Sequence, residues 1–222
     1  KGAPWAAETV QVVRDIALAE LTGARLHIAH VSTASSVAAI RTAKKNGIRI
    51  SAEAAPHHFA LNDKDINGYN ADWKMNPPLR ADKDRQALLA GLADGTIDAI
   101  ATDHAPHGCG AKSLGMDAAP FGVIGLETSL AIALTDLFHK KILTRRKLVE
   151  RMSSGPAALL GLKNKGTLAP GADADLVIVD PDLAWTPAAP FFSKSRNTPF
   201  AGRKLKGRAL TTLSAGRVVH AL

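Results

Sequence analysis

Residues 26–31 read Leu26-His27-Ile28-Ala29-His30-Val31, an apolar run that two histidines interrupt. The turn-forming pair Ser32-Thr33 follows, and a helical pattern begins at about Ser35. A short apolar run that ends in turn-forming residues is typical of a buried β-strand. The sequence therefore predicts a strand followed by a helix at this point.

The same unit recurs along the chain. An amphipathic helix from Trp5 to Leu21 precedes the run, and Gly23 is expected to end that helix. Downstream, the pattern predicts strands at residues 48–54 and 96–102 and helices at residues 82–93, 126–138 and 144–152. Asp82 is expected to cap the first of these helices. Two long connections, residues 56–81 and 103–125, separate the elements, and loops of this length in a compact domain usually carry function.

Alternating strands and helices indicate a parallel sheet, either open and doubly wound or part of a (β/α)8 barrel. A whole barrel takes about 250 residues, whereas this chain has 222 residues. After Leu162 the composition changes, and residues 174–179 and 211–220 are β-rich, the second stretch as a hairpin around Ala215-Gly216. The predicted fold class is therefore α/β, part of a TIM-type barrel followed by a small β appendage.

Composition is that of a globular protein from a reducing compartment. Hydrophobic residues make up 46% and charged residues 22%, and no apolar run is long enough to cross a bilayer. Cys109 is the single cysteine, and residues 1–5 have no apolar signal core behind them, so a cytoplasmic location is expected. The net charge is +8, but the basic residues are scattered, which favours an ordinary solvated surface over a nucleic-acid site. The positive field would also suit a small anionic substrate.

Polar side chains stand where the apolar strands end, and packing gives no reason for them. His30 closes the first strand, Glu53 lies near the end of the second, and Asp103 closes the third, with His104 and His107 just beyond. In a (β/α)8 barrel the carboxyl ends of the strands meet at one opening. An imidazole and a carboxylate are both suitable zinc ligands, so His30 and Asp103 would make half of a catalytic metal site.

Only one of the two histidines in residues 26–31 can face the barrel axis, because side chains alternate along a strand. His30 shares a face with Ile28, while His27 points the other way. The position at the strand end favours His30 as the metal ligand. His27 is expected to be packed or hydrogen-bonded under a helix.

Several motifs resemble one family in their order and spacing. They are His30-Val31-Ser32, Glu53-Ala54-Ala55-Pro56-His57-His58, Met75-Asn76-Pro77-Pro78-Leu79-Arg80, Ala101-Thr102-Asp103-His104-Ala105-Pro106-His107, Ala119-Pro120-Phe121-Gly122 and Ser193-Lys194-Ser195-Arg196-Asn197-Thr198-Pro199-Phe200. The series resembles that of the dihydroorotases of bacterial class I type, within the amidohydrolase superfamily. The resemblance covers essentially the whole chain and is to the C-terminal half of these enzymes.

The resemblance implies a barrel with one or two zinc ions. His30 would be the zinc ligand from the sixth strand, and Asp103 would be both the ligand from the eighth strand and the general acid/base. Substrate contacts would come from Asn76, His107 and the backbone of Phe121 and Gly122. The implied reaction is the reversible, zinc-dependent interconversion of (S)-dihydroorotate and N-carbamoyl-L-aspartate in pyrimidine biosynthesis.

The same resemblance implies that part of the site is missing. Relatives carry a His-x-His pair on the first strand, then a bridging Asp or carboxylated Lys, then another His, and no His-x-His occurs here. Residues 1–165 would be the C-terminal portion of the barrel, with strands six to eight, and residues 166–222 part of a small β-sandwich domain with a C-terminal extension. The isolated chain is expected to be inactive and to expose unpaired strand edges that the N-terminal half of the barrel would cover.

For four residues the sequence leaves two possible roles open. Glu53 binds an extra metal in some relatives, but a hydrogen bond to a ligand or a buried ion pair is favoured here. Arg80 pairs with an anion or forms a structural salt bridge. Without the family match, Asn76 equally fits a capped turn before Pro77-Pro78, and His107 fits a surface histidine.

Other functions also stay open. Hydantoinases and allantoinases use a similar site on other cyclic amides, and substrate profiling would separate them. A non-catalytic dihydroorotase-like subunit that scaffolds a transcarbamoylase is a second alternative, against which the intact His30 and Asp103 argue. A nucleic-acid-binding module rests on charge alone. The expected partners are a small-molecule substrate and a second copy in a homodimer, with neither nucleic acid nor membrane.

Overall fold

The computed structural model describes residues 3–222, and these residues divide into two compact units. The first unit holds residues 3–127 and 189–199, and the second holds residues 128–188 and 200–222. The predicted domain boundary after residue 165 stays a prediction. Over the described range, no helix has both the length and the apolar character that crossing a membrane requires.

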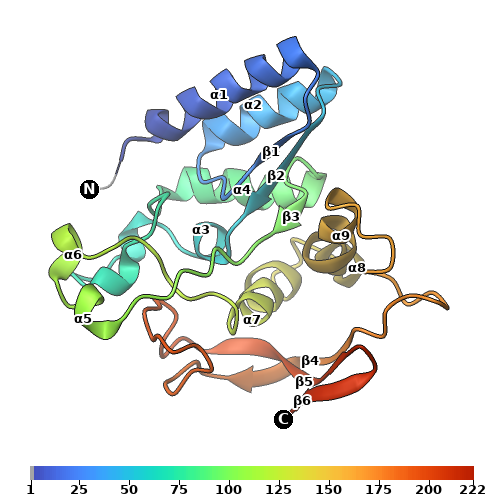
Figure 1. The fold of residues 1–222 in the computed structure, drawn as a ribbon. Coiled ribbons are helices and arrows are strands. Elements are labelled where there is room, and N and C mark those ends of the chain that lie inside the picture. The colour runs from blue at the N-terminus through green and yellow to red at the C-terminus, as the bar shows by residue number, and fades with distance from the viewer. Residues whose placement is uncertain (1–2) are drawn as a thin grey trace. The chain divides into compact units, whose positions relative to one another are not determined.

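The first unit is built on a parallel sheet, in which β1 (Leu26–Ile28) pairs with β2 (Ile50–Ala54), and β2 pairs with β3 (Ala99–Ile100) (Figure 1). The strands lie where the sequence predicts them but are shorter. β1 ends early because His30 adopts a left-handed φ of 38°, and the chain beyond β3 turns in the same way at Asp103, with a φ of 48°. Left-handed turns therefore follow the carboxyl ends of both outer strands.

Helices precede, connect and follow these strands. They are α1 (Trp5–Thr22), α2 (Ala34–Lys45), α3 (Pro56–Ala60), α4 (Asp82–Asp94), α5 (Cys109–Lys112) and α6 (Gly115–Ala118), with short 3-10 turns η1 (Asp63–Asp65) and η2 (Ala71–Trp73). Gly23 ends α1 with a φ of 67°, as predicted. The two long connections therefore contain helical turns that the sequence did not predict. The predicted cap of α4 is wrong, because the N-cap is Ala81 and the Asp82 carboxylate instead accepts a 2.8 Å hydrogen bond from Arg85 one turn further on.

The two faces of this sheet differ in what they carry. Along β2, Ile50 and Ala52 are buried, whereas Ser51 and Glu53 between and beyond them are half-buried. Helix α1 contacts β1 and α2 contacts β2, so the apolar set packs against helices. Because side chains alternate, Ser51 and Glu53 lie on the opposite face, together with His27, which is paired with Ser51 across the sheet. The face away from the helices is thus polar.

The second unit combines helices with an antiparallel sheet of order β4-β5-β6. Its elements are α7 (Ser129–Ala133), the π-helix η3 (Leu134–Phe138), α8 (Arg145–Val149), the π-helix η4 (Glu150–Ser154), α9 (Gly155–Leu159), β4 (Leu176–Trp185), β5 (Leu205–Ser214) and β6 (Arg217–Ala221). The helix predicted at 126–138 begins only at Ser129, and the one predicted at 144–152 continues through α9. Helix α7 contacts β5, which links the helices to the sheet.

The predicted C-terminal hairpin is confirmed. Ala215 and Gly216 form the turn between β5 and β6 and have φ values of 48° and 76°. Two successive positive φ values are those of the type I′ turn that closes two-residue hairpins. Elsewhere in this unit the buried carboxylate of Asp136 binds Arg203 Nη2 at 2.7 Å and Lys140 Nζ at 2.6 Å, so its charge is balanced where water is excluded.

Candidate active site

His30 and Asp103 each lie just beyond the carboxyl end of a strand, His30 after β1 and Asp103 after β3. Both have a positive φ, a conformation that costs a non-glycine residue on the order of 1–2 kcal/mol. Burial raises the pKa of Asp103, His30 lowers it, and Glu53 raises it. His30, Glu53 and Asp103 therefore lie within electrostatic reach of one another. Strained backbone held at a cluster of ionisable groups is typical of a functional site.

His57 completes this cluster, although the sequence assigned it no role. Pro56 starts α3 directly after β2, and this places His57 in the buried first turn. Its Nε2 lies 3.8 Å from Asp103 Oδ2, beyond hydrogen-bonding distance, and has no hydrogen-bond partner among the described residues. Burial, followed by the nearby His58 and His30, holds the pKa of His57 well below its usual value. His57 is therefore neutral near pH 7 and keeps one ring nitrogen available beside the carboxylate.

His58 supports the loop that carries Asn76. Its Nε2 donates a 2.8 Å hydrogen bond to the carbonyl of Pro77, which places the proton on that nitrogen and leaves Nδ1 as an acceptor. Burial lowers the pKa of His58 to about 4. Asn76 itself is exposed between the buried Met75 and Pro77. The loop thus holds the Asn76 side chain outward, and a substrate contact through it stays a prediction.

The position predicted for His27 is wrong in one respect. Its side chain is hydrogen-bonded, as expected, with Nδ1 at 2.8 Å from Ser51 Oγ and Nε2 at 3.1 Å from Glu53 Oε2. It does not lie under a helix, however, because Ile28 is the buried neighbour and His27 is on the opposite, polar face. Strict alternation does not extend to His30, since the strand has ended before the left-handed turn. Glu53 has a hydrogen-bond partner, His27, on its own face of the sheet.

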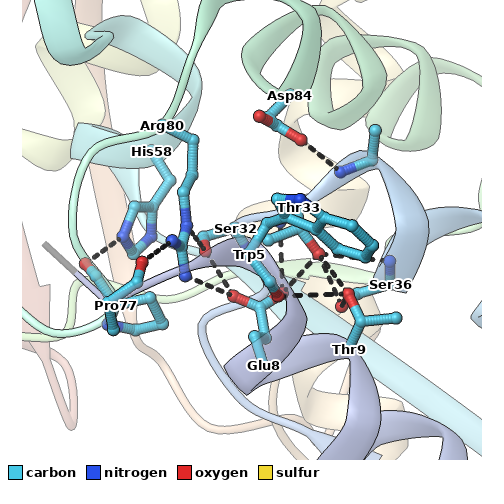
Figure 2. A network of polar contacts seen from close by, with 12 residues as sticks. Trp5, Glu8, Thr9, Ser32, Thr33, Ser36, His58, Pro77, Arg80 and Asp84 are labelled. Atoms are coloured by element: carbon cyan, nitrogen blue, oxygen red, sulfur yellow. Dashed lines mark hydrogen bonds and ion pairs between the residues drawn. The ribbon is translucent and has the colours of Figure 1, made fainter.

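Arg80 forms a structural salt bridge, one of its two predicted roles. Its Nη2 lies 3.9 Å from Glu8 Oε2, and its Nε donates to Ser32 Oγ at 3.1 Å (Figure 2). Glu8 Oε1 in turn accepts the backbone N–H groups of Ser32 and Thr33, at 3.0 and 3.1 Å. These contacts tie the chain just after His30 to the first turns of α1. Arg80 therefore stabilises the loop that follows His30.

His107, Phe121 and Gly122 also come together. His107 Nε2 donates a 2.8 Å hydrogen bond to the carbonyl of Phe121. Gly122 has a φ of 136°, and a Cβ there would lie 2.5 Å from the Ala105 Cβ, so only glycine fits. The Gly122 N–H donates to the Lys74 carbonyl at 2.9 Å. A substrate that used this N–H or His107 Nε2 would have to compete with these bonds, and the predicted substrate contacts stay predictions.

The donor set fits part of a zinc site. A neutral imidazole from His30 and a carboxylate from Asp103 are ligands that zinc prefers. No group of three His, Cys, Asp or Glu side chains that could hold a metal ion occurs among residues 3–222. His104 lies near this cluster in sequence, but its Nδ1 accepts the Gly125 N–H at 3.1 Å. The chain thus supplies two donors and the open nitrogen of His57.

The sequence of this chain is similar to those of known proteins. The amidohydrolase family model matches residues 6–219. The chain is 55% identical over 221 residues to the dihydroorotase of Pelotomaculum thermopropionicum, covering 99% of this chain and 51% of that protein. It is 53% identical over 223 residues to the dihydroorotase of Anaeromyxobacter dehalogenans, with 99% and 51% covered. The chain spans about half the length of the curated relatives it matches, and the predicted resemblance is confirmed.

Solved structures agree as well. The L-hydantoinase (dihydropyrimidinase) from Arthrobacter aurescens matches with a TM-score of 0.90 at 32% identity, over 96% of this chain and 48% of that one. The dihydropyrimidinase from Brevibacillus agri matches with a TM-score of 0.91 at 29% identity, over 98% and 49%. The predicted fold class, α/β and part of a TIM-type barrel, is confirmed. Because the family model spans nearly every residue, the chain belongs to the amidohydrolase family.

Proposed function

We propose that the full-length protein containing these residues is a dihydroorotase, which interconverts dihydroorotate and N-carbamoyl-L-aspartate for pyrimidine synthesis. One observation carries the proposal. His30 and Asp103 follow the ends of two strands of one parallel sheet, and His30 acts electrostatically on the Asp103 carboxylate, in a chain that is 55% identical to a dihydroorotase. The first residue offers a neutral ligand and the second a ligand that can also move a proton.

The proposed cofactor is zinc, held by His30 and Asp103 together with ligands from outside residues 3–222. Bound zinc lowers the pKa of a water molecule to about 7 and polarises a carbonyl group. His57 would stay neutral beside the pair, because its burial holds its pKa well below the usual value. A neutral neighbour adds no positive charge that would oppose metal binding.

Asp103 is the proposed proton carrier. In ring opening, the oxygen of a water molecule bonds to the ring carbonyl carbon, and the bond from that carbon to the ring nitrogen breaks. Asp103 accepts the proton of the water and passes it to the departing nitrogen. Burial raises the pKa of the Asp103 carboxyl, and His30 lowers it.

Asn76 and His107 are the proposed contacts for the substrate carboxylate. Asn76 is exposed, and His107 lies where Asn197 and Phe121 hold it. Lys74 adds a positive charge next to this region, since its Nζ lies 4.6 Å from the centre of the Phe121 ring. An anionic substrate would be attracted by this charge and by the net charge of +8.

Hydantoinase activity is the alternative, favoured by the solved structures that match with TM-scores of 0.90 and 0.91. The two substrate classes differ in one group, because dihydroorotate carries a carboxylate that hydantoin and dihydrouracil lack. Assays of the zinc-loaded, full-length protein should give a kcat/KM for dihydroorotate at least 100-fold above those for the other two. A preference for hydantoin or dihydrouracil would replace dihydroorotase with the alternative.

A further inference from the structure

The side chain of Asn197 makes three hydrogen bonds near the predicted substrate contacts. It lies in residues 189–199, which belong to the first unit although they come late in the chain, and it is only 1% exposed. Its Nδ2 donates to the carbonyls of Ala105 and Gly122, each at 3.0 Å. Its Oδ1 accepts the His107 backbone N–H at 3.2 Å. One amide side chain therefore joins the two segments that carry His107 and Gly122.

The backbone of the same residue adds a further link. The carbonyl of Asn197 accepts the Ile124 N–H at 2.9 Å, and the Ala105 N–H donates to the Val123 carbonyl at 2.9 Å. His104 and Val123 also form a parallel bridge. Residues 104–107 and 121–124 thus run side by side, and Asn197 closes the pair. Only an amide offers one acceptor and two donors in this arrangement, because a carboxylate has no N–H and a lysine no acceptor.

We propose that Asn197 is a positioning residue that holds His107 and the Phe121–Gly122 backbone in one fixed frame for the substrate carboxylate. The proposal rests on the dihydroorotase function, because that function gives His107 its ligand. Without Asn197, the carbonyls of Ala105 and Gly122 and the His107 N–H would lose buried partners. The two segments would then be joined by fewer hydrogen bonds, and His107 would be held less firmly where a carboxylate can meet it.

This role predicts an effect on substrate binding rather than on the metal. In the full-length, zinc-loaded protein, Asn197→Ala should raise the KM for dihydroorotate about tenfold, while zinc content is unchanged and kcat falls less than threefold. Asn197→Asp should raise KM at least as much, because it keeps the acceptor for His107 but sets a negative charge against two carbonyls. Ser195→Ala is the matched control, a buried polar residue of the same segment, and should leave KM unchanged.

A merely structural role gives a different result. If Asn197→Ala lowers the melting temperature and the active fraction but leaves KM unchanged, the positioning role is wrong. Amide hydrogen exchange without substrate tests the frame independently of any reaction. The His107 amide, which donates to the Asn197 side chain, should exchange at least tenfold faster in Asn197→Ala than in Ser195→Ala, while the amides of β2 exchange at the wild-type rate. Equal exchange at His107 overturns the proposal, even if the protein should prove to act on hydantoin rather than on dihydroorotate.

Discussion

Two polar clusters of the first unit both include residues from the segment 30–33. They differ in how many of their polar atoms have hydrogen-bond partners. The anchor network consists of Glu8, Ser32, Thr33 and Arg80 (Figure 2). Both carboxylate oxygens of Glu8 accept hydrogen bonds there, from the backbone and side chains of Ser32 and Thr33. The strand-end cluster consists of His30, Glu53, His57 and Asp103. Within residues 3–222, His57 Nε2 of this cluster has no hydrogen-bond partner and lies 3.8 Å from Asp103 Oδ2.

The difference separates polar groups that hold the fold from polar groups that are kept for a ligand. A buried polar atom without a partner costs roughly 1–3 kcal/mol, so each such atom calls for an explanation, such as a ligand, a water molecule or a further segment that meets it. In the anchor network, the hydrogen bonds to both carboxylate oxygens of Glu8 offset the free energy lost when this group is removed from water. The strand-end cluster instead keeps a nitrogen and a carboxylate free at the carboxyl ends of strands. We therefore expect changes in the first cluster to affect stability and changes in the second to affect chemistry.

The largest effect is expected at Asp103. In the full-length, zinc-loaded protein, Asp103→Asn should lower kcat for dihydroorotate by at least about 1,000-fold, because the amide cannot carry the proton. Steady-state assays with metal analysis measure this. Asp98→Asn is the control from the other end of β3, where the carboxylate binds Lys44 Nζ at 2.6 Å and the Ala52 N–H at 2.8 Å. Asp98→Asn should lower the stability of the protein but leave kcat unchanged. An equal loss of kcat in both variants would contradict the proposed role of Asp103.

A smaller effect, on stability, is expected at Glu8. Glu8→Gln replaces one acceptor oxygen with an N–H2 group and removes the charge that faces Arg80, so the free energy of unfolding should fall by about 2–3 kcal/mol. Urea denaturation measures the fall, and kcat/KM of the folded protein should stay within threefold. Asp15→Asn on the same helix is the control, because its pair with Arg14 at 2.7 Å is exposed and worth about 0.5 kcal/mol. Loss of activity without loss of stability in Glu8→Gln would reverse the assignment.

The smallest effect is a dependence of stability on pH. The pKa of His58 is lowered from 6.5 to about 4, and that of His57 is lowered as well. Between pH 6.5 and about 4, His58 is protonated in the unfolded chain but not in the folded chain. The free energy of unfolding therefore falls as the pH falls from 6.5 towards 4. For His58 alone the loss is about 1 kcal/mol between pH 6.5 and 5.5. Urea denaturation at several pH values should show a shallower slope for His58→Asn, and an unchanged slope would place the titration elsewhere.

Local patterns in the sequence predicted the elements of the fold but not their ends. Gly23 ends α1 and Ala215-Gly216 turns the hairpin, because in each case the residue type itself decides the backbone. The end of β1 could not be predicted in this way. His30 adopts a left-handed φ of 38° that histidine does not favour, and this conformation depends on contacts from distant parts of the chain.

The same limit applies to the site. His30 and Asp103 stood out because apolar strands have no packing reason to end in such residues. His57 did not stand out. Its burial and the lack of a hydrogen-bond partner for its Nε2 among the described residues are tertiary properties, which adjacent residues do not reveal. Asn197 lies 90 residues from His107, and no spacing rule connects them. Residues that act at strand ends are thus visible in sequence, whereas residues that act through tertiary contacts are not.

The affinity for zinc tests most directly whether His30, in the turn after β1, binds the metal and His27, within β1, does not. Competition with a chelator should be measured for the full-length wild type, His30→Ala and His27→Ala, which differ only in which neighbouring imidazole is removed. We expect His30→Ala to weaken zinc binding at least tenfold, and His27→Ala, whose ring bonds Ser51 and Glu53, to change it less than threefold. Unchanged affinity in His30→Ala, or an equal loss in His27→Ala, would contradict the assignment of His30 to the metal.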